Sequence, residues 1–327
     1  MDLPAALKSK LDELACAEHT TTLKAHAQKV SDTYRFASRN GQRLVSDSSA
    51  ILSYALTRMP ATFAAVSAVA KELLAAVNAL SDCHSLFDVG AGTGAATWAL
   101  LNAGFAGSIT CFEREDEMRR LGQKLMRDAY PDVAWQTFDL TRDKLPDSAD
   151  IVIASYVLNE LAEAHRLSAV DQLWQRTGRY LILVEPGTKA GFANIKQARG
   201  ELIKSGAFVL APCPCNEPCP LPADDWCHFS CRLARSKIHK ALKSADAPFE
   251  DEKFSYLIAS RVPAPVSLKG CARVLRHPRI DKGKVELELC TPRTPQGLVH
   301  QVITRKQSDL YKKARKLSAG DAWDEAK

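Results

Sequence analysis

The stretch that decides the fold is SLFDVGAGTG, residues 85–94, in which a short apolar run passes directly into three alternating glycines. Such a run predicts a buried strand, and Gly90, Gly92 and Gly94 allow a tight turn and close approach of the backbone to a ligand. The helix-like segment ATWALLNAG follows at once. This order of strand, glycine loop and helix predicts a nucleotide-type α/β domain, although the glycines alone are weak evidence.

Apolar runs and helix-like segments continue to alternate from this loop to about residue 200. SITCFERE, VAWQTFDL, ADIVIASYV and RYLILVEPG predict four further strands, and MRRLGQKLMRDA predicts one of the helices between them. Strands and helices that alternate at this spacing form a parallel sheet covered by helices on both faces. We therefore expect the fold class α/β, with a Rossmann-like sheet.

Acidic residues in or after three of these strands indicate which cofactor the loop binds. Asp88 ends the first apolar run, Glu113 closes the second strand where a ribose diol would be held, and Asp139 closes the third. A dinucleotide fingerprint normally has the spacing G-x-G-x-x-G and gives no role to Asp139. An NAD enzyme is therefore the weaker interpretation.

This succession of glycines and acids resembles the class I S-adenosylmethionine-dependent methyltransferases. In that family the glycine loop passes the methionine part of the cofactor, and the acids after the second and third strands hold the ribose and face the adenine amine. The resemblance implies S-adenosylmethionine as the cofactor. The residues implied to bind it are Asp88, Gly90, Gly92, Gly94, Glu113, Asp139, Leu140 and Ser155.

The fourth strand ends in ASYVLNEL, residues 154–161, where such enzymes face the methyl acceptor. The Asn/Asp-Pro-Pro-aromatic tetrad of base-nitrogen methyltransferases is absent there, as is the nucleophilic cysteine of pyrimidine C5 methylation. Asn159 and Glu160 are the candidate catalytic residues, and Asn159 is equally well interpreted as the cap of the next helix. The sequence thus predicts cofactor binding more firmly than methyl transfer.

The regions on either side of this domain differ from it. Residues 1–80 have apolar positions at helical spacing, and Pro60 marks a helix start. Beyond about residue 204 the chain predicts a basic helix and short strands. We expect a helical N-terminal region (1–80), a cofactor-binding domain (81–204) and a small β-rich module with the cysteines and most of the positive charge (205–327).

Positive charge is concentrated in this C-terminal part. The protein has a formal net charge of +6, and residues 232–316 alone carry 20 lysines and arginines against 8 acids. A basic region on a neutral body indicates a polyanion partner, most simply RNA, with a solvated charged surface as the plainer alternative. The cations with near-helical spacing that would meet phosphate are Arg232, Arg235, Lys237, Lys240 and Lys243.

Five of the ten cysteines fall within residues 213–231, in a proline-rich segment with few apolar runs. Such a segment cannot build a core from its own side chains, so a metal or cluster held by thiolates would explain how it is ordered. The paired C-x₂-C knuckles of zinc ribbons are absent. Cys213 and Cys219 each precede a proline, as in ferredoxin-type runs, and Cys290 ends a later strand where it would complete a four-thiolate set.

Longer blocks carry a more specific resemblance. ILVEPGTKAGFANIKQARGELI, APCPCNEPCPL, DWCHFSCRLARSKIHKALK and VELELCTP, with TRMPATFAAV ahead of the glycine loop, together resemble the methyltransferase-like family of small-ribosomal-subunit assembly found in bacteria and mitochondria. Mitochondrial members are similar in carrying a four-cysteine [4Fe–4S] site. The ligands that this resemblance implies, with zinc as the alternative occupant, are Cys213, Cys219, Cys227 and Cys290.

Cys215 and Cys231 depart from the family pattern, and we expect both to be bystanders. The resemblance implies an S-adenosylmethionine-binding protein that acts in small-subunit assembly and translation through rRNA binding, with rRNA methylation as its enzymatic form. Two alternatives stay open. One is a non-catalytic iron–sulfur assembly factor, and the other is a small-molecule methyltransferase with a structural zinc site.

The sequence also predicts where the protein works. No run approaches the roughly 20 apolar residues of a membrane span, and the N-terminus lacks both a signal-peptide core and the arginine-rich character of a transit peptide. We expect a cytoplasmic protein without membrane contact that is monomeric away from the ribosome. In a reducing compartment, clustered cysteines favour metal binding or catalysis over disulfides.

Overall fold

The computed structural model describes residues 2–36, 47–77, 80–263, 271–292 and 297–324. The N-terminal helices are α1 (Ala5–Cys16), α2 (Thr20–Phe36), α3 (Ser48–Thr57) and α4 (Met59–Ala76), followed by a 3₁₀ turn η1 (Leu80–Asp82). The next strands are β1 (Ser85–Val89), β2 (Ser108–Glu113), β3 (Ala134–Thr137), β4 (Ala149–Ser155), β5 (Thr177–Pro186), β6 (Phe208–Ala211), β7 (Phe229–Ala234) and β8 (Phe249–Ser260). The helices among them are α5 (Ala95–Asn102), α6 (Asp116–Met126), α7 (Glu163–Gln175), α8 (Lys189–Lys204) and α9 (Lys237–Lys243). The remaining elements are β9 (Ala272–Val274), β10 (Arg279–Asp281), β11 (Lys284–Cys290), β12 (Leu298–Thr304), η3 (Arg305–Gln307), α10 (Ser308–Ala314) and β13 (Ala322–Trp323).

The larger sheet has the order β3-β2-β1-β4-β5-β8-β6, and β7 pairs with β8. Strands β1 to β5 are parallel, whereas β8 runs antiparallel to β5, β6 and β7. This order, with one reversed strand beside β5, is that of a class I methyltransferase sheet, so the predicted α/β fold is confirmed. The strand order reverses between β1 and β4, and ligands of such sheets bind at the carboxyl ends of the strands at that point.

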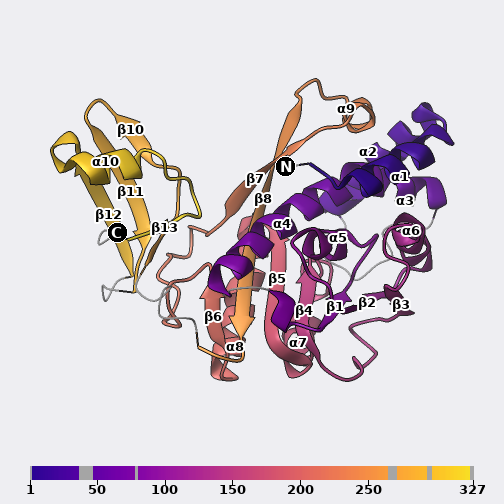
Figure 1. The fold of residues 1–327 in the computed structure, drawn as a ribbon, viewed down its shortest axis with the longest axis horizontal. Coiled ribbons are helices and arrows are strands. Elements are labelled where there is room, and N and C mark those ends of the chain that lie inside the picture. Colours follow the sequence, from indigo (N-terminus) through magenta and orange to yellow (C-terminus); the bar gives the residue numbers. More distant parts are fainter. Residues whose placement is uncertain (1, 37–46, 78–79, 264–270, 293–296, 325–327) are drawn as a thin grey trace.

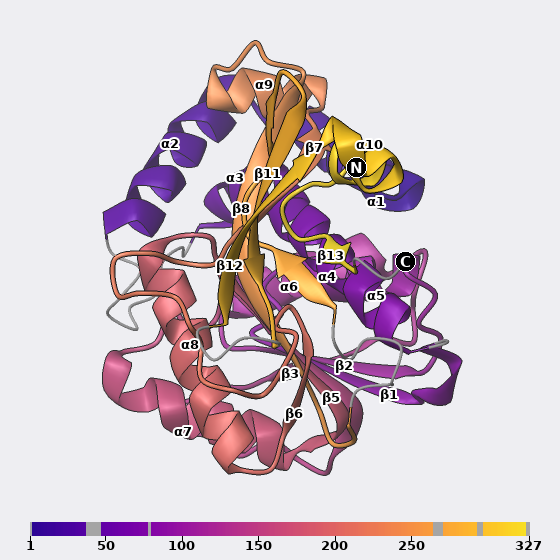
Figure 2. The ribbon, with the colours of Figure 1, turned by 90° about the vertical axis from the view of Figure 1, so that its left-hand side faces the viewer.

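Apolar side chains on both faces of the central strands explain why helices cover both sides of the sheet. Ile151 and Ile153 of β4 join the core beneath α4 and α5, whereas Val152 and Ala154 join the core beneath α7 and α8. Successive residues of a strand point to opposite faces, so a continuous apolar run produces a strand buried on both sides. Figure 2 shows α7 and α8 on one side of the strands and α4 and α5 on the other.

Helix α4 is the main cover of the first face. It begins at Met59 with Pro60 in its first turn, as predicted from the sequence. By length and composition alone, this helix of the described chain would pass as a membrane span. Most of its surface is buried against α5 and the strands β7 and β8, which is the setting of a core helix in a globular protein.

A second sheet forms the C-terminal module, with the order β10-β11-β9-β13 and β12 paired to β11. It packs on α10 through a core that includes Val285, Leu287 and Tyr311, and it lies beside the larger body in Figure 1. Strands β6, β7 and β8 belong to the larger sheet, so the boundary expected at residue 204 falls inside that sheet. The apolar stretch of β8 is buried on both faces, which explains why it joins the larger sheet.

Candidate functional site

A small cavity of about 110 Å³ lies over the glycine loop, at the carboxyl ends of the strands beside the point where the strand order reverses. This is the place where open α/β sheets bind their ligands. The sequence-predicted residues that line it are Gly90, Gly92, Glu113, Asp139, Leu140, Ser155 and Glu160.

The glycines of the loop have separate roles. Gly90 has φ +72°, and a Cβ there would lie 2.4 Å from Cγ2 of Val157, so only glycine fits. Gly92 has φ +56° and open space where a Cβ would stand, which leaves its backbone facing the cavity. Gly94 has φ +86° but lies outside the cavity lining, and its Cβ would meet Cε of Met126 at 2.4 Å. Gly94 therefore serves close packing rather than ligand approach.

Asp88 lies beneath the loop rather than in the cavity wall. Its side chain is fully buried, and Oδ2 accepts hydrogen bonds from the Thr97 backbone N–H (3.1 Å) and from Thr97 Oγ1 (2.7 Å). Burial raises the pKa of Asp88 to about 6. Its Oδ1 is buried without a hydrogen-bond partner among the described residues. The structure thus places Asp88 as the anchor between β1 and α5, one layer below the cavity.

Glu113 is the last residue of β2, Asp139 lies just beyond β3, and both line the cavity. The two oxygens of Glu113 accept hydrogen bonds from the backbone N–H groups of Gly92 (2.7 Å) and Glu115 (2.8 Å). Burial outweighs these bonds and holds the pKa of Glu113 above its ordinary value. Burial also acts on Asp139, but hydrogen bonds from Thr141 (2.6 and 2.9 Å) prevail and lower its pKa.

Of the two catalytic candidates, Glu160 reaches the cavity and Asn159 does not. Burial, together with repulsion from the carboxylate of Glu113, raises the pKa of Glu160 to about 8. The interpretation of Asn159 as a helix cap is wrong, because α7 begins at Glu163 with Ala162 as its cap residue.

The cavity is strongly acidic. Among its described lining residues, the one arginine, Arg114, faces four acids, namely Glu113, Glu115, Asp139 and Glu160. Negative charges gathered around a cavity repel an anionic ligand and favour a cationic one.

Many of the lining residues were not predicted from the sequence as site residues, among them Tyr54, Met59 and Tyr156. Tyr54 and Met59 come from α3 and α4 and form part of the cavity wall, so the N-terminal helices are part of the site. Tyr156 follows Ser155 with φ +63°, and its hydroxyl donates to Glu252 of β8 at 3.0 Å. The block TRMPATFAAV contains Met59 but not Tyr54, and nothing in it indicated a contact with the cavity.

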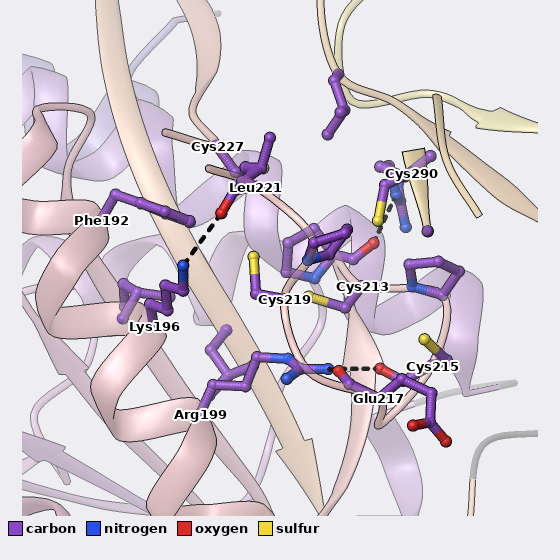
Figure 3. Close-up of a pocket in the computed structure, with 18 of the residues that line it drawn as sticks. Phe192, Lys196, Arg199, Cys213, Cys215, Glu217, Cys219, Leu221, Cys227 and Cys290 are labelled. Atoms are coloured by element: carbon purple, nitrogen blue, oxygen red, sulfur yellow. Dashed lines mark hydrogen bonds between the residues drawn. The ribbon is translucent and has the colours of Figure 1, made fainter. Parts of the chain in front are cut away.

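A larger cavity of about 680 Å³ lies between α8, the proline-rich segment, β8 and the C-terminal module. Figure 3 shows cysteines on its walls, with Lys196 and Arg199 reaching in from α8. Cys231 lies instead in β7, within the main core. The cysteines that line the cavity are the predicted ligands Cys213, Cys219, Cys227 and Cys290, together with Cys215.

These thiols lie within electrostatic reach of one another. Burial and repulsion from Cys213, Cys219 and Cys290 raise the pKa of Cys227 above its ordinary value. Burial and repulsion from Cys213, Cys219 and Cys215 raise the pKa of Cys290 to about 12. Thiolates are the metal-binding form, so a bound cation would stabilise the charged state that the cavity otherwise disfavours.

The predicted metal centre itself is not shown. In the ranges that the structure describes, no three His, Cys, Asp or Glu side chains stand close enough to hold one metal ion. A zinc ion requires four sulfurs at about 2.3 Å from a single point. An iron–sulfur cluster takes one thiolate at each of several iron atoms, so it accepts sulfurs spread over a wider wall. The described thiols therefore line one cavity without forming a single-metal site.

Three of the five cations expected to face phosphate are paired within the β7–α9–β8 hairpin. Arg232 donates to both oxygens of Asp251 (2.7 and 2.9 Å), and Arg235 and Lys243 contact Glu250 at 3.1 and 2.6 Å. The stretch also forms β7 before α9, so the expected basic helix is shorter than predicted. Exposed cations of the C-terminal module are Arg279, Lys282, Arg305, Lys306, Lys312, Lys313, Arg315 and Lys316.

Comparison with known families gives one match that covers most of the chain. Residues 48–324 match the family described as "Mitochondrial small ribosomal subunit Rsm22". The human protein named "Ribosome assembly protein METTL17, mitochondrial" is 32% identical over 296 residues, which cover 83% of this chain and 61% of that protein. The Schizosaccharomyces pombe protein named "Rsm22-cox11 tandem protein 2, mitochondrial" is 25% identical, with 83% and 42% covered. The chain thus spans about three-fifths or less of the length of these relatives.

Solved methyltransferase structures are also similar. Magnesium protoporphyrin IX methyltransferase from Synechocystis PCC 6803 with bound SAH has a TM-score of 0.43 and 17% identity, covering 71% of this chain and 93% of that one. A SAM dependent methyltransferase from Aquifex aeolicus has a TM-score of 0.42 and 15% identity, covering 67% and 100%. Scores at this level add nothing to the sheet order described above.

Proposed function

The chain belongs to the Rsm22 family of the small ribosomal subunit, and from this membership we propose that it is an S-adenosylmethionine-binding, methyltransferase-like protein of small-subunit assembly. The observation that carries the cofactor part is the acidic cavity at the point where the strand order of a class I sheet reverses. The assembly part rests on the family match and on the printed name of the human relative.

The charge of the cavity favours S-adenosylmethionine over a dinucleotide. This cofactor carries a sulfonium and an ammonium group, whereas the pyrophosphate of NAD would face Glu113 and Asp139. Thr93 Oγ1 lines the cavity and is buried without a hydrogen-bond partner among the described residues, so it is available to a ligand. We assign Glu113 to the ribose and Asp139 to the adenine. When bound, the cofactor supplies an electrophilic methyl group.

A second candidate function, a non-catalytic assembly factor, is favoured by the size of the cavity. Its volume of about 110 Å³ is below the roughly 300–1,000 Å³ of typical ligand pockets. Tyr54 and Met59 form part of its wall, so binding of a whole cofactor requires side chains such as these to move. A cofactor confined to so small a cavity would stabilise the fold without meeting a methyl acceptor.

We further propose that the cysteine cavity holds a [4Fe–4S] cluster on Cys213, Cys219, Cys227 and Cys290, with zinc as the alternative occupant. The cluster would join the proline-rich segment to the C-terminal module. The exposed cations of that module would then contact rRNA phosphates, with the protein monomeric off the ribosome. The relatives are named as mitochondrial. We therefore propose that this protein acts where a mitochondrial-type small ribosomal subunit is assembled, rather than in the general cytoplasm that the sequence predicted.

Calorimetry with the full chain tests the cofactor proposal. We expect S-adenosylmethionine to bind and NAD not to bind, and we expect Glu113→Ala to weaken binding of S-adenosylmethionine. Asp147→Ala, which removes an exposed acid remote from the cavity, is the matched control. Absence of binding to the wild-type protein contradicts the proposal. Transfer of labelled methyl groups to purified small subunits then separates the enzyme from the non-catalytic factor.

A further inference from the structure

One buried arginine enters the cysteine cavity from α8. Arg199 is only 6% exposed, and it lines the cavity together with Phe192 and Lys196. The spacing of these three residues places them on one face of the helix, the face turned to the proline-rich segment. A buried cation at this place needs a reason, because burial of charge is costly unless the charge is compensated.

The contacts of Arg199 fix the backbone between two predicted ligands. Its Nη2 donates to the carbonyl oxygens of Cys215 (2.8 Å) and Glu217 (2.7 Å). Both carbonyls lie in the loop that joins Cys213 to Cys219, and Figure 3 shows the guanidinium reaching this loop. Two hydrogen bonds from one planar group hold the loop in a single orientation relative to α8.

The guanidinium also has a donor for which the described residues provide no partner. Nε of Arg199 is buried without a hydrogen-bond partner in the described ranges. Arg273, on the opposite wall, differs, because its guanidinium donates to the Pro212 carbonyl (2.9 Å) and also pairs with Glu72 (2.8 Å). In the described ranges no carboxylate pairs with Arg199, which lies close enough to the Cys213 thiol to interact with it. No carboxylate among the described residues therefore compensates its charge, and Nε remains a free donor.

We propose that Arg199 is a positioning residue that balances the negative charge of a thiolate-bound cluster and holds the loop between Cys213 and Cys219. The inference rests on the proposed function, since it takes the iron–sulfur cluster as the occupant. Four thiolates exceed the positive charge of the cluster core, so the bound group is an anion that a buried cation stabilises. Charge and hydrogen bonds near a cluster also set its reduction potential.

Two variants of the full chain, loaded with iron and sulfide under anaerobic conditions, separate charge from geometry. Arg199→Met removes the cation, so we expect a more negative midpoint potential and faster cluster loss to a chelator than in the wild type. Arg199→Lys keeps the charge but not the paired hydrogen bonds, so we expect a potential near the wild-type value with faster loss. Lys204→Met is the control, because it removes an exposed cation from the same helix.

Two quantities are measured. The first is the midpoint potential, from a redox titration monitored by electron paramagnetic resonance. The second is the rate of cluster loss, from the decay of the cluster absorbance. A loaded Arg199→Met protein with unchanged potential and unchanged cluster loss overturns the inference while leaving the cluster proposal intact. A wild-type protein that holds no iron overturns both. If Arg199→Met does not fold, Arg199→Lys decides, and cluster loss at the wild-type rate counts against the inference.

Discussion

The two cavities of this protein are built in opposite ways. The cavity over the glycine loop is formed by strand ends and helix starts, and hydrogen bonds such as those from Gly92 and Glu115 to Glu113 already fix its walls. Much of the cysteine cavity is formed by residues 212–228, which contain neither helix nor strand. The first cavity is thus a product of the sheet, whereas the walls of the second depend on side-chain contacts such as those of Arg199 and Arg273 with the backbone of residues 212–228.

Their charges are opposite as well. Carboxylates dominate the lining of the small cavity, while the guanidinium groups of Arg199 and Arg273 lie in the walls of the large one. A cationic cofactor suits the first, and an anionic metal–thiolate group suits the second. Loss of the bound group should therefore reduce the stability of the protein more at the cysteine cavity than at the cavity over the glycine loop.

Removal of a proposed cluster ligand tests this difference with the largest expected effect. We expect Cys219→Ser to lose nearly all bound iron and to lower the melting temperature by roughly 10 °C. The reason is that a ligand present at a thousandfold its Kd adds about 4 kcal/mol to the free energy of unfolding. Iron and sulfide analysis, with thermal unfolding followed by circular dichroism, measures both.

Cys215→Ser is the matched control for that substitution, because Cys215 lines the same cavity and is predicted to be a bystander. We expect it to retain its iron. Equal iron loss in the two variants contradicts the assignment of ligands, and iron retention by Cys219→Ser contradicts the cluster itself.

On the glycine side, two alanine substitutions compare a packed position with an open one. Gly90→Ala places a Cβ 2.4 Å from Val157 in a left-handed backbone, so we expect it to reduce the free energy of unfolding by about 2–4 kcal/mol. Gly92→Ala meets only the backbone cost, which is about 1 kcal/mol. Urea unfolding of the metal-free proteins measures both losses. Equal losses of unfolding free energy would show that Val157 moves aside for the added Cβ. The cavity wall would then be less rigid than the structure indicates.

The larger sheet was predictable because its signals are local. A glycine loop between a strand and a helix, and acids at strand ends such as Glu113, depend on residues that are neighbours in sequence. The extent of the sheet was not predictable in the same way. Nothing near residue 204 indicates that the apolar stretch of β8 returns to pair with β5, since pairing over that distance is decided by the tertiary fold.

The two sites were predictable to different degrees for the same reason. Glu113, Asp139 and Glu160 were predicted from their positions at or after strand ends, whereas the part of the wall formed by Tyr54 and Met59 depends on helix packing from far upstream. The strand end at Cys290 made it a candidate fourth thiol, but its assignment to the set with Cys213, Cys219 and Cys227 came from the family resemblance. The role of Asp88 beneath the loop also required the structure, because burial cannot be read from a motif.

The acidity of the small cavity predicts a pH dependence of cofactor binding. Glu160 has its pKa raised to about 8, so its carboxyl group is mostly protonated at pH 7 and mostly ionised at pH 9. A cation binds the ionised form, so affinity for S-adenosylmethionine should rise about tenfold between these two values. Glu160→Gln should remove the rise.

Calorimetry at several pH values measures this effect. Burial also raises the pKa of Glu185 to about 8, but Glu185 lies outside the cavity lining and accepts hydrogen bonds from Asn194 and the Leu158 N–H. The Glu160→Gln protein therefore separates the two carboxyl groups. A rise of the same size in that variant would assign the pH dependence to Glu185 or another acid.

The smallest expected effect concerns the surface of the C-terminal module. Lys306 and Lys316 are exposed there, whereas Arg232 of the hairpin is held by both oxygens of Asp251. Each lysine that contacts a phosphate contributes about one unit to the slope of log affinity against log salt concentration. The double variant Lys306→Ala, Lys316→Ala should therefore bind small subunits a few-fold more weakly with a slope reduced by about two, while Arg232→Ala should leave the slope unchanged. Filter binding over a range of salt concentrations measures both quantities. If Arg232→Ala reduced the slope more than the double variant did, the RNA contact would lie on the β7–α9–β8 hairpin. The cysteine cavity would then have no direct link to the RNA-binding surface.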